Sequence, residues 1–144
     1  MELKEAENIV RSSLMPHNPS SHALEQDLIS TQLSCSPKPD ETFEFPGGIV
    51  AIEYERDFPS QCIQKYWWLL NHTDYLKSGK KLAMVSITIN RDAERQEQTE
   101  RLGALGRELE KKFPAFSFYH IAYADATPDA ISAALAKAYE AVKA

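Results

Sequence analysis

The sequence lacks the features that mark membrane and secreted proteins. It contains no apolar run close to the ~20 residues that a membrane-spanning helix needs, and its acidic, amphipathic start does not resemble a secretion signal. It has only two cysteines, Cys35 and Cys62, and their spacing matches no metal-binding or redox motif. We therefore expect a cytoplasmic protein with reduced thiols and no membrane contact.

Glycine and positive charge are also scarce. None of the five glycines builds a Gly-x-Gly-x-x-Gly turn between a strand and a helix, because Gly47-Gly48 precedes a strand. This speaks against a doubly wound nucleotide-binding domain. The chain carries 16 basic and 21 acidic residues, a net charge of −5. That balance removes the simplest argument for nucleic-acid binding but leaves a local basic patch open.

What remains is an ordinary globular composition. The chain has 144 residues, of which 43% are hydrophobic and 26% charged. This length suits one compact domain and is short for two, so we expect a single domain over residues 1–144. The composition also excludes disordered and collagen-like classes.

Hydrophobic periodicity predicts alternating helices and strands. Apolar residues at helical spacing favour helices over 2–14, 61–72 and 92–113 and a last helix from Pro128, capped by Thr127, to the C-terminus. Ser20 or Ser21 could cap a shorter helical piece that ends at Ile29. Residues rich in β-formers favour strands over 43–45, 49–55, 82–89 and 116–123, with a weak edge strand over 31–39. Pro46-Gly47-Gly48 joins the first two as a β-hairpin. A hairpin followed by β-α-β-α predicts an α/β fold, a mixed central sheet with helices on both faces.

The second hairpin strand carries an unusual pair of acids. Glu53 and Glu55 lie two residues apart, so they project from the same face and continue the apolar row of Ile49 and Ala51. Two adjacent carboxylates repel each other, and a divalent cation removes that repulsion. The plainer alternative is a strand that surfaces at its end and exposes two solvated acids.

Asp40 is the natural third acid, 13 residues before Glu53 on the other arm of the hairpin. The strand register decides whether it joins. A three-residue turn at 46–48 places Glu41 opposite Glu53 and Asp40 on the far face, whereas a shift of one residue brings Asp40 opposite Glu53 or Glu55. We favour Asp40 and keep Glu41 as the substitute.

Pro39-Asp40 followed by Glu53-Tyr54-Glu55 resembles the PD-(D/E)XK nuclease superfamily, whose fold is called restriction-endonuclease-like. The core of that family runs helix, three-stranded meander, helix, strand, which agrees with the elements expected over residues 2–88. The chain departs from the family pattern at Glu55, where the motif has lysine. Other family members carry the lysine on the following helix, and Lys65 lies there, at the edge of the apolar face.

The resemblance implies a nuclease that hydrolyses phosphodiester bonds, with DNA the expected substrate. Asp40, Glu53 and Glu55 would hold Mg²⁺, with Mn²⁺ as a substitute, and Lys65 would offset charge on the scissile phosphate. Glu7 on the first helix would add an outer contact. Homodimerisation is common in this fold and stays open here.

The alternative hypothesis to an active nuclease is a catalytically inert nuclease-fold module for binding or assembly. Its contact surfaces would be the acidic end of the sheet and Trp68. Helical spacing places Tyr66 and Trp67 in the core and Trp68 on the opposite, exposed face of its helix.

Overall fold

The computed structural model describes residues 1–20, 39–56, 59–72, 79–90 and 96–144. These ranges hold α1 (Leu3–Leu14), β1 (Glu41–Phe45), β2 (Gly48–Glu55), α3 (Pro59–His72), β3 (Lys81–Thr88), α4 (Gln96–Lys112), β4 (Phe116–Ile121) and α5 (Pro128–Val142). Two short 3-10 helices cover Met15–His17 and Tyr123–Asp125. Residues 21–38 are not described. They hold Cys35, the helical piece expected to end at Ile29 and all of the expected edge strand except residue 39.

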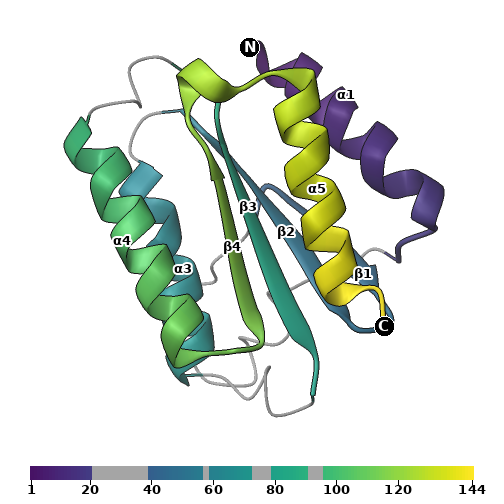
Figure 1. Ribbon diagram of the computed structural model, residues 1–144, viewed down its shortest axis with the longest axis vertical. Helices are drawn as coiled ribbons and strands as arrows, with labels where there is room; N and C mark the ends of the chain where they lie inside the picture. Colours follow the sequence, from purple (N-terminus) through teal and green to yellow (C-terminus); the bar gives the residue numbers. More distant parts are fainter. Residues whose placement is uncertain (21–38, 57–58, 73–78, 91–95) are drawn as a thin grey trace.

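The four strands form one mixed sheet in the order β1-β2-β3-β4. β1 pairs antiparallel to β2, while β3 is parallel to both β2 and β4. Helices α3 and α4 lie on one side of the sheet, and α1 and α5 on the other (Figure 1). The predicted α/β architecture, with helices on both faces of a mixed sheet, is confirmed.

The hairpin turn is one residue shorter than the three-residue turn considered from the sequence. Phe45 pairs with Gly48, so only Pro46 and Gly47 lie between the strands. Gly48 is required where β2 starts, because a Cβ there would lie 1.9 Å from the carbonyl oxygen of Lys81. All eight residues of β2 are buried, as expected of a strand that is covered on both faces.

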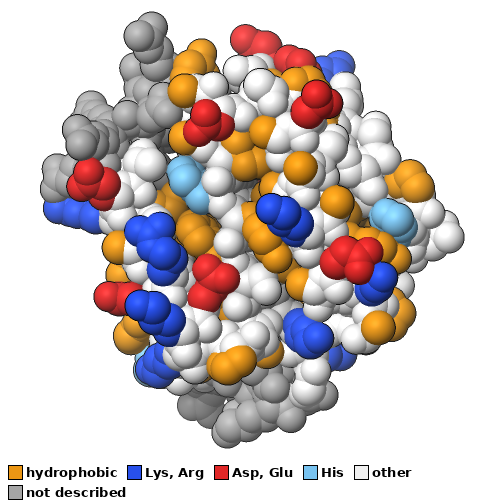
Figure 2. Space-filling view, viewed as in Figure 1, with side chains coloured by type: hydrophobic (Ala, Val, Ile, Leu, Met, Phe, Trp, Pro, Cys, Tyr) orange, Lys and Arg blue, Asp and Glu red, His pale blue; other side chains and the backbone are white. Residues whose placement is uncertain are grey.

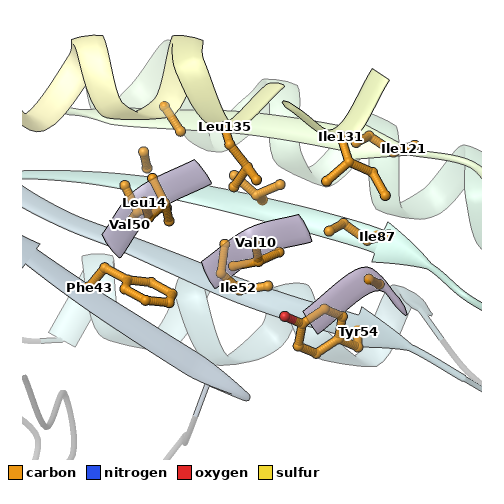
Figure 3. Packing of buried hydrophobic residues seen from close by; sticks show 14 of the residues in the cluster. Val10, Leu14, Phe43, Val50, Ile52, Tyr54, Ile87, Ile121, Ile131 and Leu135 are labelled. Carbon is orange, nitrogen blue, oxygen red and sulfur yellow. The ribbon is translucent and has the colours of Figure 1, made fainter. Parts of the chain in front are cut away.

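The face covered by α1 and α5 is apolar along the described length of β2. Val50, Ile52 and Tyr54 of β2 project to this face and pack against α1 and α5 (Figure 3).

Helix α5 begins after Thr127, whose hydroxyl accepts a hydrogen bond from the Ala130 N–H at 3.2 Å, as expected of an N-cap.

The face covered by α3 and α4 has a second apolar cluster, which includes Ile49, Ala51, Tyr66, Leu82 and Leu102. Helix α4 approaches β4 closely at Gly106, where a Cβ would meet the ring of Phe118 at 2.3 Å. The described part of α4 runs from Gln96 to Lys112, and residues 92–95 of the predicted helix lie outside the described residues. None of the helices in the described ranges has both the length and the apolar character to cross a lipid bilayer.

Candidate functional site

A polar row crosses the sheet on the α3/α4 face. On this face the residues of β2, β3 and β4 change from apolar to polar at the same level of the register. The last apolar row consists of Ala51, Met84 and Phe118. The following row consists of Glu53, Ser86 and His120. Because the three strands are parallel, this row lies toward their carboxyl ends, the edge at which open α/β sheets bind ligands.

Asp40, which directly precedes β1, extends this row beyond β2 to the other arm of the hairpin. Glu41 pairs with Ile52, so continuing the register by one residue places Asp40 opposite Glu53. Its Oδ2 accepts a hydrogen bond from the Tyr54 N–H at 2.7 Å. Asp40 is exposed, and its charge contributes to raising the pKa of both Glu53 and Glu55.

Glu41, the substitute considered for Asp40, lies on the opposite face of the sheet. It shares a face with Ile52, hydrogen-bonds the Tyr54 hydroxyl and pairs with Arg11 at 2.9 Å. The register that would have placed Glu41 opposite Glu53 is therefore wrong, because the turn between the strands has two residues and not three.

Glu53 is held by two side chains of α3. Its carboxylate is only 4% exposed and lies 3.2 and 3.3 Å from the Lys65 ammonium. The Tyr66 hydroxyl donates a hydrogen bond to Glu53 Oε1 at 3.0 Å. Lys65 is 34% exposed, so its side chain is partly buried while its ammonium reaches the buried acid.

Glu55 is also buried, and two uncharged groups among the described residues hydrogen-bond it. The Ser86 hydroxyl lies 3.5 Å from Glu55 Oε1, and the Cys62 thiol also hydrogen-bonds this carboxyl group. Cys62 is a free, buried thiol, and burial raises its pKa. The two glutamates therefore do not project into bulk solvent, which contradicts the plain interpretation of a strand that surfaces at its end.

Both glutamates hold protons more tightly than an exposed carboxyl group does. Burial raises the pKa of Glu53 to about 7; Lys65 opposes this shift, and Asp40 adds to it. Burial likewise raises the pKa of Glu55 to about 7, opposed by the Cys62 hydrogen bond and assisted by the charge of Glu53. A carboxyl group that changes charge near neutral pH is suited to general acid–base chemistry.

Glu7 does not join this cluster. It lies on α1 and pairs with Arg11 at 3.3 Å, next to Glu41. Helix α1 packs on the other face of the sheet, so the predicted outer contact from Glu7 to the acids is wrong.

The two tryptophans of α3 differ from their predicted positions. Trp67, expected in the core, is 45% exposed, because it lies at the flank of the buried row formed by Ile63, Tyr66 and Leu70. Trp68, expected to be exposed, is half-buried and packs on His72, with ring centroids 4.3 Å apart. An exposed contact surface built on Trp68 is therefore not supported.

Several residues of the site could not be found from motif spacing. Tyr66, Cys62, Ser86 and His120 belong to no motif, and His120 has no metal-ligand spacing to another histidine. A signal was present in β3: the alternation Leu82, Met84, Ser86, Thr88 changes from apolar to polar within a buried strand, as Ala51 to Glu53 does in β2.

The donor chemistry of the polar row and the neighbouring Glu55 matches a hard divalent cation, but their carboxylates are not gathered into a cage. Asp40, Glu53 and Glu55 offer the carboxylate oxygens that Mg²⁺ and Mn²⁺ prefer. In the part of the chain that the structure describes, no group of three His, Cys, Asp or Glu side chains is arranged to hold a metal ion. The positive charge beside Glu53 comes from Lys65.

The surface over α4 carries charged side chains of both signs. On the face in Figure 2, basic side chains occur over α4 but are interspersed with acidic ones. Helix α4 exposes Arg101, Arg107, Lys111 and Lys112 together with Glu100 and Glu108. This surface is therefore mixed in sign.

Comparison with protein-family models, with curated proteins and with solved structures finds no match to this chain.

Proposed function

We propose that the polar row is the centre of a divalent-cation-dependent phosphodiester hydrolase with a restriction-endonuclease-like core. One observation carries the proposal: Asp40, Glu53 and Glu55 lie on one face at the carboxyl end of β2, with the Lys65 ammonium 3.2 Å from Glu53. The supporting topology is a helix, a hairpin, a helix and a strand parallel to the second hairpin strand, in that order.

Each residue has a distinct part in this proposal. Asp40 and Glu53 are the expected cation ligands, since they face each other across the hairpin. Glu55 is a further ligand or the base that orients the attacking water, and its pKa of about 7 suits the second role. Lys65 offsets the charge that grows on the phosphate in the transition state.

Loading a cation requires a small rearrangement of these side chains. Lys65 would have to share or release a Glu53 oxygen, and Asp40 would offer the carboxylate oxygen that does not accept from the Tyr54 N–H. Bound Mg²⁺ or Mn²⁺ would polarise the phosphate and lower the pKa of a coordinated water. The ligands must be ionised, so occupancy should rise between pH 6 and pH 8.

This chemistry suits nucleic acid as the substrate class, and DNA is the expected member of that class. A chain of net charge −5 needs local basic groups or a second subunit to hold a polyanion. The mixed surface of α4 supplies some of these groups, and a homodimer would double them. In this proposal the enzyme acts in the cytoplasm.

A cleavage assay with a matched pair of variants tests the proposal. Labelled single- and double-stranded DNA is incubated with the wild type, Glu53→Gln and Glu41→Gln, in Mg²⁺ or Mn²⁺ and in EDTA. We expect cation-dependent cleavage that Glu53→Gln lowers at least a hundredfold and that Glu41→Gln, on the opposite face, leaves unchanged. Cleavage that survives Glu53→Gln would remove the assigned site.

A second candidate is an inert nuclease-fold binding module. The observation that favours it is the Lys65–Glu53 ion pair, because an internal cation leaves less need for a metal ion. Thermal unfolding separates the two candidates: Mg²⁺ or Mn²⁺ stabilises a cation-binding site by mass action. A melting temperature that neither ion changes would favour the inert module.

A further inference from the structure

A hydroxyl group and an imidazole lie beyond the acids in the polar row. Ser86 pairs with Glu53 in the parallel register, and His120 pairs with Ser86. Ser86 is fully buried, whereas His120, on the outermost strand of the sheet, is half-buried. The row therefore runs from the edge strand to the acids on β2.

Contacts connect three polar side chains in sequence: His120, Ser86 and Glu55. His120 Nδ1 lies 3.4 Å from Ser86 Oγ, and Ser86 Oγ lies 3.5 Å from Glu55 Oε1. Both distances are at the long end for a hydrogen bond, as is common in sites that tighten only when a ligand binds. A fully buried hydroxyl without a hydrogen-bond partner lowers the stability of the protein, so we expect Ser86 to use these two partners.

Counting donors fixes the direction of the hydrogen bonds. When Glu55 is ionised, as at the pH of the test below, it can only accept, so the single hydrogen of Ser86 points to it. Ser86 Oγ must then accept from His120, which requires the hydrogen of the neutral imidazole to be on Nδ1. An isolated neutral histidine has no such constraint.

We propose that Ser86 and His120 are positioning residues: His120 orients the Ser86 hydroxyl, which holds the Glu55 carboxylate in the orientation that the proposed cation site needs. The part concerning the cation rests on the proposed function. The part concerning Glu55 stands on the contacts alone. Partners of this kind, one step behind a metal ligand, typically change metal affinity 10- to 100-fold.

The first arm of the test needs no metal ion and no activity. Long-range ¹H–¹⁵N spectra at pH 8.5, where an ordinary imidazole is neutral, report which nitrogen of His120 carries the hydrogen. We expect Nδ1–H in the wild type. In Glu55→Ala the Ser86 hydroxyl is free to donate to His120, and in Ser86→Ala the acceptor is lost, so both variants should lose the Nδ1–H preference.

The second arm measures Mn²⁺ affinity by calorimetry. His120→Phe and Ser86→Ala should weaken binding at least tenfold. His120→Asn, whose amide N–H can replace Nδ1–H, should stay within about threefold of the wild type. Ser117→Ala is the control, because Ser117 is on β4 but in register with Ala83 on the opposite face.

The two arms separate the possible failures. A wild-type His120 with its hydrogen on Nε2, or a tautomer that Glu55→Ala leaves unchanged, overturns the positioning chain. Mn²⁺ binding that His120→Phe leaves intact overturns its role at the cation site. If the wild type binds no Mn²⁺, the proposed function fails, and the tautomer alone decides whether Ser86 and His120 hold Glu55.

Discussion

The two faces of the sheet use the same strands for different purposes. Toward α1 and α5, β2 presents Val50, Ile52 and Tyr54, and the apolar cluster continues to the end of the strand. Toward α3 and α4, β2 changes after Ala51 to the buried acids Glu53 and Glu55. Side-chain alternation thus lets one strand contribute a stabilising core on one side and a chemically reactive surface, at some cost in stability, on the other.

The largest effect is expected where the apolar face loses a buried side chain. Leu135 of α5 is fully buried, so Leu135→Ala removes apolar contacts and leaves a cavity. We expect a loss of about 4 kcal/mol in the free energy of unfolding, measured by urea denaturation. Leu105→Ala, at a half-buried site on α4, should cost about 1 kcal/mol. Equal losses at the two sites would contradict the assigned core.

The acidic face should make stability depend on pH in an unusual direction. The pKa of Glu53 and that of Glu55 are each raised to about 7 in the folded protein, from about 4.5. Between these values the folded state keeps protons that the unfolded state has lost. The stabilisation is therefore complete below pH 4.5 and is lost as the pH rises through 7.

We expect this contribution to amount to about 3 kcal/mol for each glutamate across that window. Urea denaturation between pH 5 and pH 8 measures it, with Glu53→Gln reducing the slope. Leu105→Ala is the control, since it lowers stability without adding or removing a titrating group. A wild-type stability that rises from pH 5 to pH 8 would show that other groups outweigh the two glutamates.

The ion pair on the acidic face should contribute more to stability than the ion pair on the apolar face, and its contribution should depend on pH. Lys65→Met leaves Glu53 buried without its ammonium partner, so at pH 8 we expect a loss of about 2 kcal/mol. The loss should shrink at pH 5, where Glu53 is protonated. Arg11→Met breaks a solvent-exposed pair with Glu41 and should cost less at both pH values. Equal costs at pH 5 and pH 8 for Lys65→Met would argue against an ionised Glu53.

The smallest effect concerns a helix end far from the acids. Thr127→Ala removes the hydroxyl that caps α5, so we expect a loss of about 1 kcal/mol in unfolding free energy. Thr127→Ser keeps the hydroxyl and serves as the control. Cation affinity should be the same in both variants, because α5 packs on the other face.

Periodicity was sufficient to predict the helices and strands of the described ranges and the inward faces of α1, α5 and β2. The apolar spacing in α1 and α5 and the unbroken β-formers of β2 each fix a face locally, and the structure agrees. The rule that residues two apart share a strand face also placed Glu53 and Glu55 together.

The rest of the site depends on contacts that no local pattern specifies. Whether Asp40 or Glu41 faces Glu53 is decided by a single residue in the turn at Pro46–Gly47. Ser86 and His120 join the row only through the parallel register of three strands that are separated in sequence by helices. Trp67 and Trp68 are adjacent in sequence, so which one is exposed depends on what packs beside each ring.

Cation binding tests the central claim most directly. Mn²⁺ is titrated at pH 8 into the wild type, Glu53→Gln and Glu41→Gln, and binding is followed by calorimetry. We expect one ion per chain in the wild type and in Glu41→Gln, with affinity at least a hundredfold weaker in Glu53→Gln. An absence of binding in the wild type, or equal binding in Glu53→Gln, would contradict it.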